Sequence, residues 1–171
     1  MSEADTVIYS PPARVDLHAL HELGAVRLAL SDRAPRLARE AVSGWLGADH
    51  PAREIVALAA SELVTNAVRY SDAVSTGDGA DAIMLELAQA PDFLRLAVTD
   101  PGSVSTAPPD IPPQTANPYS EHGRGLAIVQ RLSRGRWGNC QTPPQGLRLV
   151  WCHLDRQPTP AQLEELFSAP D

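Results

Sequence analysis

Three groups of residues along the chain have the types and spacing that chemistry requires. The first lies in the segment SELVTNA, where Glu62 and Asn66 are four residues apart. On a helix, residues at that spacing project from the same face, one turn above the other. The carboxylate of Glu62 can serve as a general base, and the amide oxygen of Asn66 suits a hard Mg²⁺ ion. The alternative is that both, with Thr65 and Arg69, form the solvated side of that helix.

The second group is centred on Asp100, which closes a strand-like run in the segment VTDPGS. Pro101 and Gly102 then favour a tight turn in which the glycine can take a positive φ. A carboxylate seated in an apolar cleft can accept a hydrogen bond from the exocyclic amino group of adenine. The alternative is an aspartate that caps backbone amides at the start of a loop.

The third group is the glycine-rich segment EHGRGLAIV, which contains Gly123, Arg124 and Gly125. Two glycines at a helix start let backbone amides approach a phosphate, and the helix dipole favours an anion there. Arg124 can add a charge-assisted contact. The alternative is an ordinary glycine-rich turn that enters a helix.

The residues around Glu62 and Asn66 carry the strongest periodic signal in the chain. Apolar residues recur every four positions and predict a helix over residues 51–70, with Pro51 in its first turn. Glu62 and Asn66 are expected on the flank opposite the apolar stripe. The stripe consists of Ile55, Val56, Ala59, Ala60, Leu63, Val64, Ala67 and Val68.

Asp100 follows two strand patterns, predicted over residues 83–88 and 93–98. Side chains alternate in both patterns, and the link at residues 89–92 is short enough for an antiparallel hairpin. A second hairpin is predicted from residues 136–140 and 147–154. Between the hairpins, the glycine-rich segment opens a helix whose apolar face consists of Leu126, Ile128, Val129 and Leu132.

Two further helices and one strand complete the predicted elements. A strand is predicted over residues 26–30, after which Ser31 can cap a helix that runs to Gly47, with Pro35 near its start. Thr159 and Gln162 form a capping box for a short helix that ends near residue 168. Strands and helices segregated in this way predict an α/β (α+β) two-layer sandwich, in which helices cover one face of a mostly antiparallel sheet.

Length, composition and charge exclude several classes of function. The 171 residues favour one domain over residues 1–171, with a core at about 26–154, a loose tail at 1–14 and a proline-rich loop at 103–122. All 14 positive charges are arginine, which excludes a P-loop lysine or a lysine nucleophile. A net charge of −7 disfavours direct binding to nucleic acid. The chain has no signal-peptide pattern and no apolar run of about 20 residues, so we expect a cytoplasmic protein without membrane contact.

Several other residues are assigned to packing or to the surface. Cys140 and Cys152 are expected to be free thiols, with a disulfide across the second hairpin as the alternative. His18 and His21 are expected at the surface. Three tryptophans are expected in packing and three arginines at a solvated helix end, with partner docking as the alternative for the arginines. These six are Trp45, Trp137, Trp151, Arg131, Arg134 and Arg136.

Taken in order, the three groups of residues resemble the motifs of the Bergerat-fold (GHKL) ATPases. Within that superfamily, the segments SELVTNAVRY, VTDPGS, EHGRGLAIVQRLSRGRWG and GLRLVW are most similar to small bacterial anti-sigma-factor serine/threonine kinases. The resemblance runs from about Leu28 to Leu154. It implies a single ATP-binding domain of histidine-kinase-like type.

The resemblance also implies a role for each candidate residue. Glu62 matches the general base, Asn66 the Mg²⁺ ligand, and Asp100 the residue that reads adenine. Gly102 would give close backbone approach to the base, and residues 103–122 correspond to a lid over ATP. The end of that lid would bind phosphate through a nucleotide-binding run made of Gly123, Arg124, Gly125 and Leu126.

The function implied is that of an ATP- and Mg²⁺-dependent serine/threonine kinase that regulates transcription by partner switching. Its partners would be a sigma factor and an anti-anti-sigma protein, and a homodimer is a further expectation. Tyr70, Val104 and Leu147 depart from the family pattern and weaken catalysis more than nucleotide binding. The alternatives are a catalytically silent ATP-binding interaction module, the detached catalytic domain of a histidine kinase, and an α/β domain that binds no nucleotide.

Overall fold

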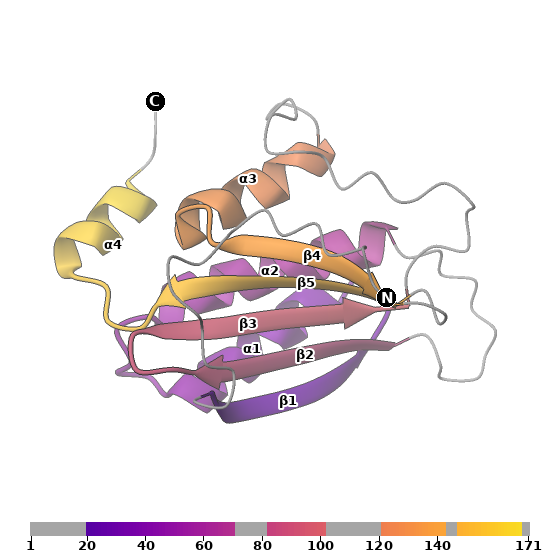
Figure 1. Ribbon diagram of the computed structural model, residues 1–171, viewed down its shortest axis with the longest axis horizontal. Coiled ribbons are helices and arrows are strands. Elements are labelled where there is room, and N and C mark those ends of the chain that lie inside the picture. The colour runs from indigo at the N-terminus through magenta and orange to yellow at the C-terminus, as the bar shows by residue number, and fades with distance from the viewer. Residues whose placement is uncertain (1–19, 71–81, 102–120, 143–146, 169–171) are drawn as a thin grey trace.

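The computed structural model of the protein describes residues 20–70, 82–101, 121–142 and 147–168. These residues form two layers, an antiparallel sheet and a set of helices (Figure 1). The predicted tail, Gly102, Val104 and the second hairpin's turn lie outside the described residues. So does the predicted lid, except for its last two residues.

The sheet has five strands in the order β1-β2-β3-β5-β4, and every neighbouring pair is antiparallel. Both predicted hairpins are confirmed, β2 with β3 and β4 with β5. The first strand is longer than predicted, because it begins five residues earlier and pairs with β2 along its length. The strands are β1 (His21–Ala29), β2 (Ala82–Gln89), β3 (Phe93–Asp100), β4 (Trp137–Thr142) and β5 (Leu147–Asp155).

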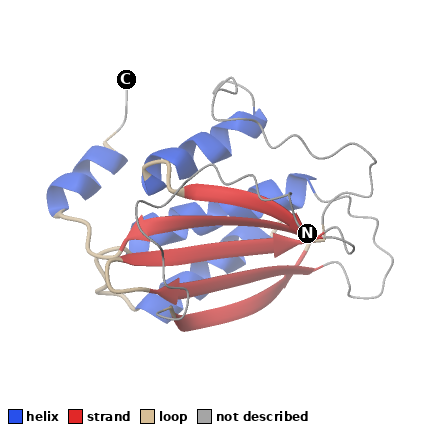
Figure 2. Cartoon of the chain, viewed as in Figure 1, coloured by secondary structure: helices blue, strands red, loops and turns tan. Residues whose placement is uncertain are grey.

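Three helices pack on one side of this sheet, and a fourth extends from its end (Figures 1 and 2). α1 (Ala34–Leu46) packs against α2 (Arg53–Tyr70) and β1, and α2 lies against β3. α3 (Glu121–Ser133) packs against α2 and β5. α4 (Pro160–Phe167) follows β5. The predicted two-layer sandwich is therefore confirmed.

Every second side chain along each strand points toward the helices, because successive side chains of a strand lie on opposite faces of the sheet. These side chains form the core between the two layers. The apolar stripe of α2 packs against them, which confirms the periodic signal read from the sequence. The largest fully buried apolar side chains in this core are Trp137, Ile55, Leu63, Ile83, Leu85, Leu87, Leu94, Leu96 and Leu154.

The start of α1 differs from the prediction. Its N-cap residue is Arg33, whose side chain makes no capping hydrogen bond. The carbonyl oxygen of Ser31 accepts a hydrogen bond from the amide of Ala34 at 3.1 Å. Pro35 lies in the first turn of α1, where its missing N–H costs nothing and its fixed φ favours helix entry. The helix thus begins next to its proline rather than at the serine.

α2 likewise begins two residues after Pro51, at Arg53. The turn that precedes it is held by His50, whose Nδ1 accepts a hydrogen bond from the amide of Ala52 (3.0 Å). Burial lowers the pKa of His50, and Arg156 lowers it further.

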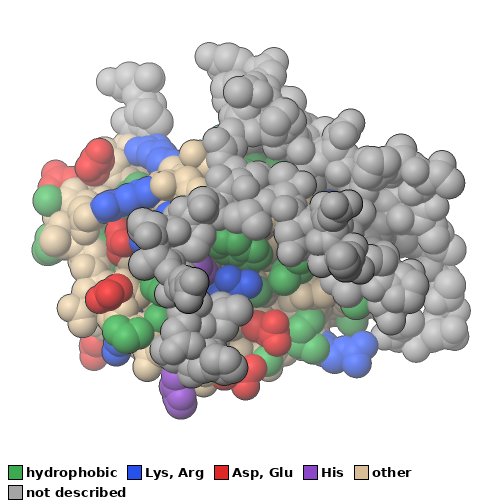
Figure 3. Space-filling model, viewed as in Figure 1, with side chains coloured by type: hydrophobic (Ala, Val, Ile, Leu, Met, Phe, Trp, Pro, Cys, Tyr) green, Lys and Arg blue, Asp and Glu red, His purple; other side chains and the backbone are tan. Residues whose placement is uncertain are grey.

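The face of the sheet turned away from α1 and α2 carries an aromatic and basic cluster on β3 and β5. Figure 3 views this face, where hydrophobic side chains gather over the strands with charged side chains between them. Phe93 stacks on His153 with ring centroids 4.3 Å apart. The guanidinium of Arg95 lies 4.9 Å from the ring centroid of Trp151 and donates to Nε2 of His153 at 3.2 Å. His153 is only 3% exposed, and this burial, with Arg95 and Arg136, lowers its pKa to about 4.

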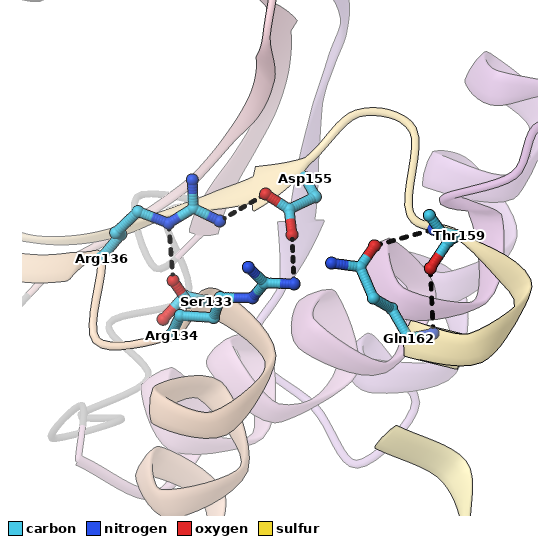
Figure 4. Close-up of polar contacts among 6 residues, drawn as sticks. All are labelled: Ser133, Arg134, Arg136, Asp155, Thr159 and Gln162. Carbon is cyan, nitrogen blue, oxygen red and sulfur yellow. Dashed lines mark hydrogen bonds and ion pairs between the residues drawn. The ribbon is translucent and has the colours of Figure 1, made fainter. Parts of the chain in front are cut away.

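At the end of β5, Asp155 binds two of the arginines that follow α3 (Figure 4). Arg136 lies 2.8 Å and Arg134 3.2 Å from its carboxylate oxygens. Arg136 also donates to the carbonyl oxygen of Ser133. The solvated helix end predicted for the three arginines is confirmed for Arg131 and Arg134, which are exposed. It is wrong for Arg136, whose side chain is partly buried against the carboxylate that β5 supplies.

The same region confirms the predicted capping box of α4 (Figure 4). The hydroxyl of Thr159 accepts from the amide of Gln162 at 3.2 Å, and the Gln162 side chain accepts from the amide of Thr159 at 2.8 Å.

Both cysteines are free thiols, as predicted. Cys140 lies opposite Leu149 and Cys152 opposite Trp137, so the register places them at different positions of the hairpin. His21 is exposed as expected, while His18 lies outside the described residues. No helix in the described part of the chain is long and apolar enough to cross a membrane.

Candidate functional site

The C-terminal half of α2 carries the first pair of candidate residues, Glu62 and Asn66. Asn66 is 6% exposed, and its Nδ2 has no hydrogen-bond partner among the described residues. A buried polar atom without a partner costs free energy, so such an atom in a folded protein needs an explanation. This burial contradicts the solvated-face alternative for Asn66, and it also corrects the expectation that Asn66 lies opposite the apolar stripe.

Glu62 lies one turn before Asn66 and is partly buried. Burial raises the pKa of its carboxyl group, and Arg69 opposes that effect. A raised pKa brings a carboxylate closer to the range in which it accepts a proton effectively. The environment of Glu62 is therefore suited to a general base.

Asp100 is the last residue of β3 and is 1% exposed. Its side chain lies on the face of the sheet that is turned toward the helices, as do those of Leu96 and Val98. Its Oδ2 accepts two hydrogen bonds from Arg148 of β5, from Nε at 3.0 Å and from Nη2 at 2.8 Å. Arg148 is also 1% exposed, so the structure contains a fully buried ion pair at this position.

Arg148 is the residue that sequence reasoning missed. The two hairpins were readable from the chain, but the pairing of β3 with β5 joins segments that are distant in sequence. Once those strands are paired, the register places Asp100 directly opposite Arg148. The available signal was an acid at the end of one predicted strand and an arginine near the start of another. Such residues lie opposite each other when the two strands pair in antiparallel fashion.

The glycine-rich segment lies inside α3 rather than before it. The helix begins at Glu121, two residues ahead of Gly123 and within the stretch predicted as the lid. Leu126 is 5% exposed and belongs to the core with Val129 and Leu132, which confirms the predicted apolar face. The side chain of Arg124 and any phosphate contact it makes lie outside the described residues.

The fold brings the three groups toward one end of the molecule (Figure 1). The C-terminal end of α2, the end of β3 and the start of α3 all lie there, and α2 packs against both other elements. This end therefore combines a partly buried carboxylate, a buried amide, a buried acid–arginine pair and a helix N-terminus.

A comparison with protein-family models finds a match over residues 20–135 to the histidine kinase-like ATPase domain. That range is well over half of the chain, and it includes Glu62, Asn66 and Asp100. This protein belongs to the family of histidine kinase-like ATPase domains. No curated protein matches the chain.

An ATPase domain of this family implies ATP as a ligand, and the Bergerat-type superfamily resemblance is supported. The match ends before β4, so Arg148 lies beyond it. ATP-binding domains usually take ATP with Mg²⁺, and the residues on α2 fit that ion. The amide oxygen of Asn66 is the kind of ligand that Mg²⁺ prefers, and it would hold the ion there.

Proposed function

We propose that this ATPase-domain protein binds Mg·ATP at the end where α2, β3 and α3 meet, and transfers its γ-phosphoryl group to a serine or threonine of a partner protein. The observation that carries the proposal is the buried amide of Asn66, with Nδ2 unpartnered among the described residues, one turn from Glu62. Nδ2 donates hydrogen bonds, so a phosphate oxygen of the nucleotide that accepts from it would remove the cost of leaving it unpaired, and Oδ1 of the same amide would be the Mg²⁺ ligand.

In this proposal each residue has one task. Asp100 accepts a hydrogen bond from the adenine amino group, and Asn66 holds the metal end of the nucleotide. Glu62 takes the proton from the incoming serine hydroxyl. The serine oxygen then bonds to the γ-phosphorus, and the bond from that phosphorus to ADP breaks, so that ADP leaves. When bound, Mg²⁺ neutralises charge on the phosphate oxygens. The protein contributes mainly position and electrostatic stabilisation.

The partners proposed from the resemblance are a sigma factor and an anti-anti-sigma protein, so that phosphorylation would decide which of them the protein binds. The location proposed is the cytoplasm, and the oligomer proposed is a homodimer. The run Gly123, Arg124, Gly125 and Leu126 is proposed to bind phosphate, and Gly102 to approach the base.

A second function is favoured by one specific observation. Leu147 stands where relatives offer a hydroxyl or an ammonium group, so a contact to the phosphates or the base is lost. A protein with this feature can bind nucleotide without turning it over. This alternative is a silent ATP-binding interaction module whose partner surface is ordered by nucleotide.

The two functions are separated by ATP turnover and ATP binding measured on the same variants. We expect Glu62→Gln to retain ATP binding and to lose at least about 100-fold in the rate of phosphoryl transfer to water or to a serine-containing partner. Glu54→Gln is the matched control, because Glu54 is an exposed glutamate in the first turn of the same helix. A wild type that binds ATP but turns over no faster than Glu62→Gln supports the silent module and contradicts the kinase.

A further inference from the structure

The ion pair between Asp100 and Arg148 is unusual in its burial and its geometry. Both side chains are 1% exposed, and two nitrogens of Arg148 converge on a single oxygen, Oδ2 of Asp100. Two donors on one oxygen fix the direction of that carboxylate more strictly than one would. The pair also joins β3 to β5 at the end of the sheet where the candidate residues of α2 lie.

Stability alone is a weak reason for such a pair. Taking two charges out of water costs several kcal/mol per ion, and well-packed apolar residues at buried positions are often as stabilising. The other buried residues that face the helices from the same part of β3 and β5, such as Val98 and Val150, are apolar. An arginine buried at this position therefore calls for a role other than holding the sheet together.

The chemistry of the pair suggests that role. An ionised carboxylate only accepts hydrogen bonds, and it can do so through either of its two oxygens. Such a group favours a base edge that presents an amino group. It disfavours an edge that presents a carbonyl oxygen, because two acceptors would face each other.

We propose that Arg148 is a specificity-determining residue of the nucleobase site, acting through Asp100. It holds Asp100 in one direction as a hydrogen-bond acceptor, so that the site selects adenine over purines that carry an oxygen at the same ring position. This inference rests on the proposed nucleotide site at the end of β3. Arg148 is a positioning residue, because it acts on the base only through the carboxylate that it holds.

The test compares ATP with ITP, which differ at the base position where an amino group is replaced by a carbonyl oxygen. Dissociation constants for both nucleotides are measured with Mg²⁺ on the wild type and on Arg148→Met. We expect the wild type to prefer ATP by at least about 100-fold. Arg148→Met should lower that ratio by at least about tenfold, because the carboxylate of Asp100 is then no longer held in one direction.

Two further variants separate specificity from folding. Arg136→Met is the matched control, because it removes one of the two arginines bound to Asp155, a carboxylate at the other end of β5, and should leave the ratio unchanged. Arg148→Lys keeps a cation beside Asp100 but lacks the two-nitrogen fork, so it should give an intermediate ratio even if Arg148→Met does not fold.

Each outcome bears on the proposal. The proposal is overturned if the wild type binds ATP and ITP equally, or if Arg148→Met has the same ratio of affinities as the wild type. In both cases ATP binding itself leaves the proposed function standing. A wild type that binds neither nucleotide overturns the proposed function together with this inference. A ratio that falls in Arg148→Met and stays constant in Arg136→Met supports it.

Discussion

His153 makes the stability of this protein depend on pH in a direction that the structure fixes. Its ring is 3% exposed between Phe93 and Trp151, and Arg95 donates to its Nε2, so the folded protein holds a neutral imidazole. Burial, with the nearby Arg95 and Arg136, lowers its pKa from 6.5 to about 4. Below pH 6.5, His153 is therefore protonated in the unfolded chain, whereas in the folded protein it stays neutral until the pH falls to about 4.

The sign of the effect follows from linkage. The contribution of His153 is fully present above pH 6.5 and is lost as the pH falls from there toward 4. One pKa unit corresponds to about 1.4 kcal/mol, so at pH 5 the 1.5 units between 5 and 6.5 amount to a loss of about 2 kcal/mol. Other groups titrate in the same interval, so the wild type must be compared with a variant that lacks only this ring.

His153→Gln is that variant, because a glutamine carbonyl can accept from Arg95 near the position of Nε2 and does not titrate. Urea unfolding at pH 7.5 and pH 5 gives the free energy of unfolding of both proteins. We expect the wild type to lose about 2 kcal/mol more than His153→Gln between these two conditions. Equal losses in the two proteins would show that His153 is protonated in the folded state and would refute the reasoning.

Three other perturbations have defined outcomes. A Cβ at position 24 would lie 2.2 Å from the ring of Trp45, so Gly24→Ala should lower the free energy of unfolding by about 1–3 kcal/mol in urea titrations, and by less in a Trp45→Leu background. Thr159→Ala removes the cap of α4 and should cost about 1 kcal/mol in the same assay, whereas Thr159→Ser should cost little. If Glu62 is the general base, the ATP turnover rate should fall at low pH with a midpoint above the ordinary glutamate pKa, because burial raises it. A turnover rate that is flat across that range would exclude Glu62 from the proton transfer.

Local patterns allowed most of the fold to be predicted from the sequence. The four-residue apolar period of α2 and the alternation in β2 and β3 are properties of neighbouring residues, so both elements could be recognised without tertiary information. The capping box at Thr159 is local in the same way. Ser31 and Pro35 give competing local signals for the start of α1, and the helix begins next to the proline rather than at the serine.

The parts that could not be predicted depend on contacts between distant segments. Asp100 was recognised as a candidate, but its partner is 48 residues away and becomes visible only when β3 pairs with β5. Asp155 reaches Arg134 and Arg136 for the same reason, through a strand that returns beside them. Asn66 was placed opposite the apolar stripe because helical periodicity does not reveal which polar positions of α2 the rest of the fold buries.

The central claim is that the protein binds Mg·ATP through Asn66 and Asp100, and thermal unfolding with and without the nucleotide tests it most directly. At about 100 times its Kd, a ligand adds roughly 2.7 kcal/mol to stability, which for a domain of this size raises Tm by about 5–10 °C. We expect this shift in the wild type and in Glu54→Ala, an exposed position on the same helix, and its loss in Asn66→Ala and Asp100→Ala. A wild type whose Tm does not change with Mg·ATP, or a shift of the same size in Asn66→Ala and Asp100→Ala, would contradict the claim.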